Sequence, residues 1–491
     1  MSDAAKPESK PTDSKPKVRP ARPEAAQTTQ HTLALAGRTL AYTATAGTLN
    51  LKDEYGEDRA SLFYVSYVLD GVADPSTRPV TFCFNGGPGS SSVWLHLGAF
   101  GPRRVVVPDT VPAPAAPHRL EDNSASLLDQ TDLVFIDPVG TGFSRPVGEG
   151  EGKHYWSVKE DVESVATFIL RWLNRNGRWT SPKLLAGESY GTTRAAGLAL
   201  ALSEKGVTLN GLILVSVALN FQTFLFETGN DLPYLLYLPS YAATAWYHGR
   251  VPGKSLQALL DEVRAWTLDV YAPALMRGPR LSDKARAAVA ARLARYTGLP
   301  ADAIAARDLR IPYLWFAKQV LGRPGVTAGR LDSRYVGRDT DPWASELTRD
   351  PSYDAIYGAY TAGINETLRR TLGWTTDDEY DVLSINVNQD WRWEQGRRRG
   401  YLNVADDLSQ AMVANPHMGV LLANGLYDLA TPFFAAEYTA DHLNIGPELR
   451  GNVRLTWYEA GHMMYLHPPS LLQLKADLDA FYRDVIPGSQ A

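Results

Sequence analysis

Three residues with the side chains of a nucleophile, a general base and an orienting carboxylate each follow an apolar run typical of a buried strand. Ser189 lies in GESYGTT, between the apolar run Leu184–Ala186 and an Ala/Leu-rich segment with helical spacing. In such a G-x-S-x-G turn, small residues on either side of the serine let neighbouring segments approach, and the hydroxyl projects at the edge of the sheet. Asp428 and His462 follow two later apolar runs. The set predicts nucleophilic catalysis, in which a histidine takes the serine proton and an aspartate holds the imidazole.

Each of the three residues also has a purely structural interpretation. Ser189 would serve as the N-cap of the following helix. Asp428 would cap a helix that begins near Pro432, and His462 would be an ordinary loop residue. The order of the three residues favours the catalytic interpretation, because a serine, an aspartate and a histidine follow one another at three strand ends. The structural interpretation would require three separate coincidences. The loops at the carboxyl ends of parallel strands converge on one crevice.

Alternating apolar runs and helical patterns must position these residues. Val80, Phe82 and Phe84 share one face of a predicted strand, and a continuous apolar run begins at Leu133. Between Val158 and Leu173, apolar residues recur every three or four positions, as in a helix with one buried face. The remaining elements are the apolar strands KLLAGE, LNGLILVSVAL, HMGVLLANG and VRLTWY, and a helix over Thr192–Ser203. The alternation predicts an α/β protein of the α/β-hydrolase fold, with a mostly parallel central sheet, helices on both faces and a helical cap insertion.

Composition divides the chain into three parts. Residues 1–34 are rich in Pro, Lys, Ser and Ala and predict a disordered polar tail, because they cannot bury enough apolar surface to offset the entropy of ordering. The α/β-hydrolase catalytic domain is expected over residues 35–220 and 401–491. Residues 221–400 are rich in Trp, Tyr, Pro and Arg and predict a mostly helical cap. The clearest helical patterns of this cap are Ser255–Arg264 and Asp283–Tyr296.

Charge and cysteine content limit the class of protein. The chain has 491 residues, a formal net charge of −5 and no long basic run, so we expect no nucleic acid partner. The longest apolar stretch, from Leu232, is broken by Pro233 and Pro239, which favours a lid or pocket wall over a membrane span. The single cysteine, Cys83, excludes an intrachain disulfide. Together with a first segment that lacks an apolar signal core, it predicts a cytoplasmic protein; the alternative is a periplasmic or secreted protein from which a signal peptide has been removed.

Five motifs occur together in the predicted catalytic domain. They are NGGPGSSS (Asn85–Ser92), FIDPVGTGFS (Phe135–Ser144), GESYG (Gly187–Gly191), NGLYDLATP and AGHMMYLHPP. In combination they resemble the serine carboxypeptidase family of peptidases, over about Leu35–Asn220 and Tyr401–Ile486, and nothing so clear covers the cap. The resemblance implies the α/β-hydrolase fold, a peptide substrate and removal of one C-terminal residue through an acyl-enzyme. The lack of the disulfides of eukaryotic-type members indicates a bacterial-type member.

The resemblance implies an oxyanion hole formed by the backbone amides of Gly87 and Tyr190. An oxyanion that develops on the attacked carbonyl needs donors already aimed at it. Glycines at positions 86 and 87 have no side chain to block that approach. The structural interpretation of NGGPGSSS is a surface turn, which its place directly after a predicted buried strand disfavours.

Recognition of the terminal carboxylate of the substrate is implied for Asn85, Gly86 and Glu188. Glu188 is next to the predicted nucleophile, where a permanent negative charge would repel that carboxylate. In similar proteins this glutamic acid is protonated and shares hydrogen bonds with the asparagine and the incoming carboxylate, since a protonated carboxyl can donate where a carboxylate cannot. The structural interpretation of Glu188 is an exposed side chain that happens to adjoin the turn.

The sequence departs from the eukaryotic-type pattern of the family. Ala99 stands where a second glutamate is expected, and Cys83 stands in place of a tryptophan. A glutamine is missing between Asp137 and Pro138. Because of these differences, neither the strength of carboxylate recognition nor an acidic pH optimum can be carried over from the eukaryotic-type members. His96, on the same segment as Ala99, either replaces part of the missing glutamate or is a plain helix-face histidine.

The leading functional hypothesis is a serine-type carboxypeptidase, a hydrolase acting on the C-termini of peptides. The alternative is an esterase or acyltransferase with the same triad, because a dry cap would let an alcohol intercept the acyl-enzyme in place of water. A binding protein with an inactive site is disfavoured by the intact triad and oxyanion motif. His462 and His467 lack ligand spacing with a third histidine or carboxylate, so we expect neither a metal nor another cofactor.

Overall fold

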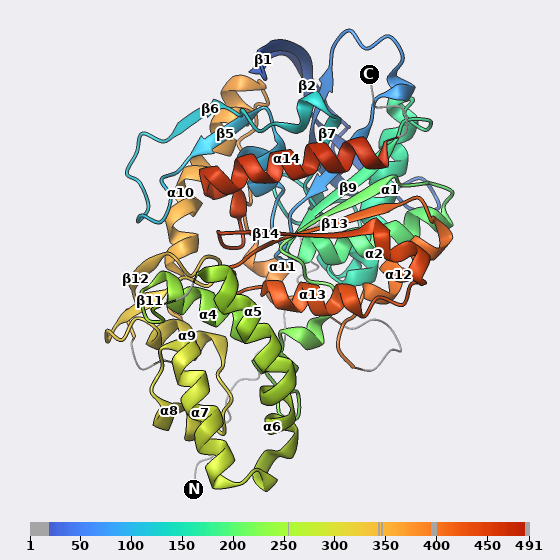
Figure 1. The fold of residues 1–491 in the computed structure, drawn as a ribbon. Coiled ribbons are helices and arrows are strands. Elements are labelled where there is room, and N and C mark those ends of the chain that lie inside the picture. The colour runs from blue at the N-terminus through green and yellow to red at the C-terminus, as the bar shows by residue number, and fades with distance from the viewer. Residues whose placement is uncertain (1–18, 254, 342–343, 345–346, 394–399, 487–491) are drawn as a thin grey trace, which may run out of the picture.

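A ten-stranded sheet runs through the larger part of the molecule (Figure 1). The structure is a computed structural model and describes residues 19–253, 255–341, 344, 347–393 and 400–486. In spatial order the strands of the main path are β1 (Ala26–Leu35), β2 (Arg38–Lys52), β3 (Asp58–Leu69), β7 (Asp132–Ile136), β4 (Val80–Phe84), β9 (Lys183–Glu188), β10 (Gly211–Val215), β13 (Gly419–Gly425) and β14 (Val453–Tyr458). The short strand β8 (Arg145–Pro146) pairs with β3. From β7 to β14 every neighbouring pair is parallel, which brings the carboxyl ends of six strands to one edge.

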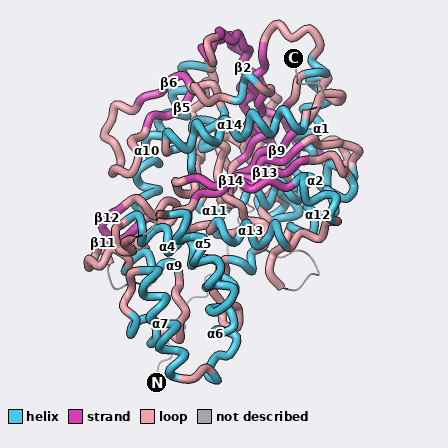
Figure 2. The backbone as a smooth tube through the Cα atoms, viewed as in Figure 1, coloured by secondary structure: helices cyan, strands magenta, loops and turns pink. Residues whose placement is uncertain are grey.

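The parallel strands are apolar on both faces because helices cover both sides of the sheet. Val80, Phe82 and Phe84 of β4 share one face, as expected, and pack with α1 (Val158–Asn176). Cys83 faces the opposite layer. The first layer also contains α2 (Tyr190–Glu204), α12 (Ala405–Ala414) and α13 (Phe433–Asp441), and the opposite layer contains α14 (Pro468–Val485) and α10 (Pro351–Glu366). Figure 2 shows the strands gathered between these helices.

Strand β1 differs from the sequence prediction, which assigned residues up to 34 to a disordered tail. Its whole length, Ala26–Leu35, pairs antiparallel with β2. Composition indicated disorder because most of its side chains are polar. An edge strand is nevertheless held by the backbone hydrogen bonds of its ladder, and Thr28, Thr29 and Thr32 are residues that favour a strand. The prediction of disorder for residues 1–18 lies outside the described residues.

The insertion forms a lobe of helices beside the sheet (Figure 1). Its helices are α3 (Leu232–Leu236), α4 (Leu238–Tyr247), α5 (Leu256–Trp266), α6 (Ala272–Arg277), α7 (Asp283–Thr297), α8 (Ala301–Ala305) and α9 (Tyr313–Gln319). Most of these helices share an apolar core that is separate from the two layers of the sheet. Within the described part of the chain, no helix is long and apolar enough to cross a membrane.

Two features of the insertion were not predicted. A short antiparallel hairpin, β11 (Val326–Ala328) and β12 (Val336–Arg338), follows the helices. The segment after it returns to the α/β body, where Ile356 and Tyr360 of α10 join the core beneath α14. The short helix α11 (Ile385–Gln389) follows, and a separate small hairpin, β5 (Arg103–Val106) and β6 (Arg119–Asp122), lies in the α/β body. The part of residues 221–400 from α10 onward therefore belongs to the body, because apolar residues of α10 and of the segment after it pack against the sheet layer.

Candidate active site

Ser189 occupies a strained turn between β9 and α2. Its backbone has φ 60° and ψ −127°, a conformation that costs about 1–3 kcal/mol for a residue with a side chain. Hydrogen bonds from Ser189 N to Val215 O and from Thr192 N to Ser189 O, at 2.9 and 2.8 Å, hold the turn. A Cβ at Gly187 would lie 2.1 Å from Gly191 O, so the two glycines are required by close backbone approach. The hydroxyl of Ser189 makes no capping bond to α2, which removes the N-cap interpretation.

Asp428 and His462 meet beside this turn, just beyond β13 and β14. His462 Nδ1 lies 2.6 Å from Asp428 Oδ2. Asp428 is fully buried, and its Oδ1 accepts from the amides of Ala430 and Thr431, so it does not cap α13. Burial alone lowers the pKa of His462, but the charge and hydrogen bond of Asp428 outweigh burial and raise that pKa. With Nδ1 bonded to Asp428, Nε2 is the nitrogen left for a serine proton.

Glu188 is buried at the end of β9, next to Ser189, which excludes the exposed interpretation. Tyr465 donates its hydroxyl to Glu188 Oε2 at 2.8 Å, and the Asn85 side chain forms a second hydrogen bond. Burial raises the pKa of Glu188 to about 7, although the charge of His462 and both hydrogen bonds oppose the shift. The carboxyl group is therefore protonated in mildly acidic solution and about half protonated near pH 7.

The glycine-rich loop after β4 lies against the first turn of α2. A Cβ at Gly86 would be 2.4 Å from Tyr190 N, so only glycine allows this approach. Gly87 has φ +102°, a conformation that also favours glycine. Tyr190 begins α2, and the first amides of a helix have no intrahelical partner. Asn85 is held by hydrogen bonds from Leu95 N to its Oδ1, at 3.0 Å, and from Arg194 to its carbonyl, at 2.6 Å.

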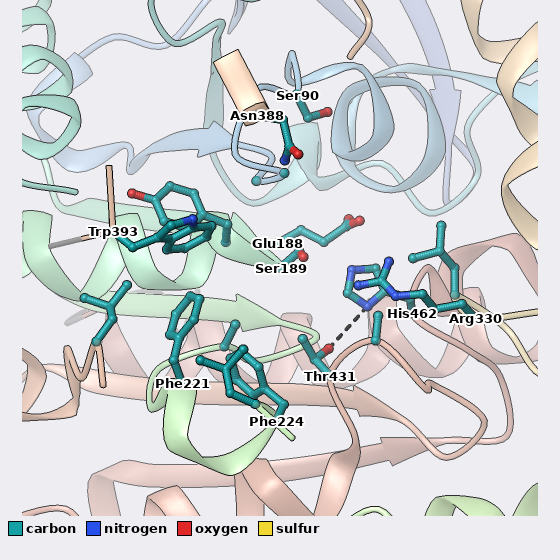
Figure 3. Close-up of a pocket in the computed structure, with 18 of the residues that line it drawn as sticks. Ser90, Glu188, Ser189, Phe221, Phe224, Arg330, Asn388, Trp393, Thr431 and His462 are labelled. Carbon is teal, nitrogen blue, oxygen red and sulfur yellow. Dashed lines mark hydrogen bonds between the residues drawn. The ribbon is translucent and has the colours of Figure 1, made fainter. Parts of the chain in front are cut away.

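The residues predicted for the site line one cavity of about 2070 Å³ (Figure 3), except for the fully buried Asp428 behind His462. One wall is aromatic and includes Phe221, Phe224 and Trp393, and Tyr237 from the apolar stretch at Leu232 lines the cavity as expected for a pocket wall. The volume exceeds the 300–1,000 Å³ typical of a small-molecule site, so it has room for several residues of a peptide. Neither Ala99 nor His96 lines it. His96 is a core residue that bonds Tyr67 and stacks on Phe135.

The turn between β11 and β12 binds the loops that carry Asp428 and His462. Leu429 N donates to Arg330 O at 3.0 Å, and His462 N donates to Leu331 O at 2.6 Å. Asp332 Oδ2 accepts from Gly461 N at 3.1 Å and from Arg334 at 2.6 Å. The cap thus supplies hydrogen bonds on which the positions of both side chains depend.

Sequence reasoning missed several residues around the site. Tyr465 lies within the motif AGHMMYLHPP, only three positions after His462, so the motif itself was a signal. Thr431 donates to Asp428 Oδ2 at 2.7 Å and lies within the motif NGLYDLATP, so its presence in that motif could also have marked it. Arg330 lies in the cap, where no motif marks it.

A nucleophile turn, an Asp–His pair and a glycine-rich loop at the carboxyl ends of four parallel strands define an α/β-hydrolase. The family model of the serine carboxypeptidases matches residues 38–297, more than half of the sequence, and the chain belongs to this family. Among solved structures, KEX1(delta)P, a prohormone-processing carboxypeptidase from Saccharomyces cerevisiae, matches with a TM-score of 0.58 and 16% identity, over 90% of this chain and 91% of that one. This likeness confirms the predicted fold.

Curated relatives match over shorter segments. Serine carboxypeptidase-like 20 of Arabidopsis thaliana is 29% identical over 189 residues, which are 38% of this chain and 34% of the relative. The pheromone-processing carboxypeptidase KEX1 of Saccharomyces cerevisiae is 31% identical over 156 residues, which are 30% of this chain and 20% of the relative. The matched segments therefore span about a third or less of these relatives' length.

Proposed function

We propose that the protein is a serine-type carboxypeptidase that removes the C-terminal residue of peptides through an acyl-enzyme. The observation that carries this proposal is the buried, protonated Glu188 beside Ser189. An α/β-hydrolase whose ester or amide substrates carry no free carboxylate does not need a protonated carboxyl group next to its nucleophile. A site that must accept a negative terminus needs a group that donates a hydrogen bond without adding negative charge.

The triad would work in two steps. Ser189 Oγ attacks the last peptide carbonyl while His462 Nε2 takes its proton, and Asp428 stabilises the imidazolium. The amides of Gly87 and Tyr190 hold the oxyanion. The peptide C–N bond breaks as His462 returns the proton to the departing amine. Water then attacks the ester, gives a proton to His462, and the proton passes back to Ser189 Oγ as the acid leaves.

Recognition of the terminal carboxylate would use Glu188, Asn85 and the amide of Gly86. Glu188 accepts hydrogen bonds from Tyr465 and from the Asn85 side chain, so the hydroxyl hydrogen of its protonated carboxyl group would be donated to the substrate. Asn85 Oδ1 is already occupied by Leu95 N, which leaves the amide nitrogen of Asn85 as its donor. These groups fix the terminal carboxylate just beyond Ser189, so that attack falls on the last peptide bond.

The test is incubation of the purified protein with N-blocked dipeptides and with the matching C-terminal amides and simple esters, followed by product analysis by mass. The proposal predicts release of the last amino acid from free-acid peptides, with a clear preference over the amides. Hydrolysis or transfer confined to esters would contradict it and favour the esterase or acyltransferase alternative.

We further propose that the chain is a bacterial-type member that acts in the cytoplasm. Support comes from its single cysteine, Cys83, which is buried and free, so the fold does not depend on oxidation. The relatives named above are from a plant and a yeast. Fractionation of cells that express the native gene tests the location, and recovery outside the cytoplasm would contradict it.

A further inference from the structure

Arg330 brings a positive charge into the cavity that the proposed mechanism does not use. It lies in the turn between β11 and β12 and is the only lysine or arginine among the described residues that line the cavity. The side chain is half-buried. Among the described residues, no salt bridge joins its guanidinium to a carboxylate, and its side-chain hydrogen bond is to Tyr313. Figure 3 shows Arg330 entering the cavity beside His462.

The backbone around Arg330 is fixed on two sides. Asp350 Oδ1 accepts from Arg330 N at 3.0 Å, and Arg330 O accepts from Leu429 N at 3.0 Å. Asp350 is an acidic group that acts on the Arg330 guanidinium electrostatically, but its oxygens already accept other hydrogen bonds. Its two oxygens also accept from Leu331 N and from the amide and hydroxyl of Ser352, at the start of α10. Asp350 therefore holds the arginine backbone in place and attracts the guanidinium from a distance, but among the described residues it forms no salt bridge with it.

The other charged groups that line the cavity do not neutralise Arg330. Glu188 is protonated below its pKa of about 7, and its charge and hydrogen bonds involve His462, Tyr465 and Asn85. Glu227 and Asp406, the other acidic residues of the described lining, are exposed, and Glu227 accepts from Tyr401 at 3.1 Å. Arg330 instead acts electrostatically on His462. A half-buried guanidinium has lost part of its hydration, and a carboxylate is the partner that restores the lost free energy, through two parallel charge-assisted hydrogen bonds.

We propose that Arg330 selects peptides that carry a second carboxylate next to the scissile bond, in addition to the terminal one at Glu188. This inference rests on the proposed carboxypeptidase function. The group that Arg330 would bind is the carboxylate of an aspartate or glutamate side chain. This side chain can belong to the C-terminal residue that leaves or to the residue before it. Since Arg330 lies beside His462, which protonates the leaving amine, the leaving residue is the expected source.

The experiment compares kcat/KM for N-blocked dipeptides that differ only in an acid or its amide. One pair ends in phenylalanyl-aspartate or phenylalanyl-asparagine, and the other ends in aspartyl-phenylalanine or asparaginyl-phenylalanine. For wild type we expect the acid to be preferred about 10- to 100-fold in one pair, the range for a hydrogen bond between charged groups. Taking the acid-to-amide ratio cancels any effect of Arg330 on His462, which acts on both members of a pair.

Variants assign the preference to this side chain. Arg330→Gln should reduce the ratio to about 1, Arg330→Glu should favour the amide, and Arg330→Lys should keep part of the preference because it lacks the planar fork. Arg338→Gln, an exposed arginine of the same hairpin, is the matched control and should leave the ratio unchanged.

The two proposals fail in different ways. A wild-type ratio near or below 1 in both pairs overturns the role of Arg330 while leaving the carboxypeptidase intact, and this result needs no variant to fold. An acid preference that survives in folded Arg330→Gln also overturns it. If none of the peptides loses its last residue, the carboxypeptidase proposal itself fails.

Discussion

Glu188→Gln separates recognition of the terminal carboxylate from the chemistry of the triad. Glu188 must be protonated to donate to a carboxylate, so free-acid peptides should lose kcat/KM as pH rises through its pKa of about 7. A C-terminal amide develops no such repulsion. The ratio of kcat/KM for the free acid to that for the amide isolates this effect, since titration of His462 affects both substrates alike. Glutamine is neutral at every pH and keeps a donor, so the variant should show a flat ratio.

The size of the effect follows from the burial of Glu188. A pKa raised from 4.5 to about 7 means that ionisation in the site costs about 3 kcal/mol more than in water, at about 1.36 kcal/mol per pH unit. Above pH 7 the protonated fraction falls about tenfold per pH unit. The wild-type ratio should therefore be constant up to about pH 6 and fall about tenfold by pH 8, until binding by Asn85 and the Gly86 amide alone sets a floor.

The assay is initial-rate kinetics from pH 5.5 to 9 on matched free-acid and amide substrates. Glu227→Gln is the control, because Glu227 lines the same cavity but is exposed, and it should keep the wild-type profile. Parallel profiles for the two substrates in wild type would refute the reasoning, and so would a decline that persists in Glu188→Gln.

Three further outcomes are expected. Glu188 ionises near pH 4.5 in the unfolded chain and near pH 7 in the folded chain, so the wild-type protein loses stability as pH rises between these values. Glu188→Gln has no such loss. In denaturant titrations, the difference in unfolding free energy between Glu188→Gln and wild type should therefore shift by about 3 kcal/mol in favour of the variant from pH 4 to pH 8. Ser189→Ala should abolish labelling by a fluorophosphonate and turnover with an unchanged melting temperature; labelling at Ser90 instead would contradict the assignment. Asp332→Asn, which weakens the bond to the loop before His462, should lower kcat more than it raises KM; an unchanged kcat would show that the loop does not depend on it.

Residues whose chemistry depends on local geometry were predictable from the sequence. Ser189, Asp428 and His462 follow strands whose apolar runs are unmistakable, and parallel strands bring such positions together whatever lies between them in sequence. Glu188 was recognised because it adjoins the serine. Its raised pKa, however, results from burial that outweighs the opposing hydrogen bond of Tyr465, 277 positions further on, and no spacing rule predicts this balance. The roles given to these residues stay predictions until the variants are made.

The features that were missed depend on contacts between distant segments. Composition assigned residues 26–34 to the tail because composition carries no information on the pairing of β1 with β2. Likewise, residues 221–400 look uniform in composition, although Tyr360 packs against the sheet layer while the preceding helices form their own core. Arg330 has no signal in sequence at all, since its place beside His462 results from one hairpin turn and from Asp350.

The hydrogen bonds between the β11–β12 turn and the two loops of the α/β body mean that this insertion is not an interchangeable module. Replacing it by a short linker would remove the acceptors of Leu429 N and His462 N together and leave two buried amides without partners. Exchange of caps between homologous enzymes should therefore succeed only when the junction lies before the hairpin, so that the helices are replaced and residues 326–338 are retained. We therefore expect homologues to differ mainly in the helices and in the cavity residues that the helices supply, such as Tyr313 of α9, and to keep the hairpin together with the loops it holds.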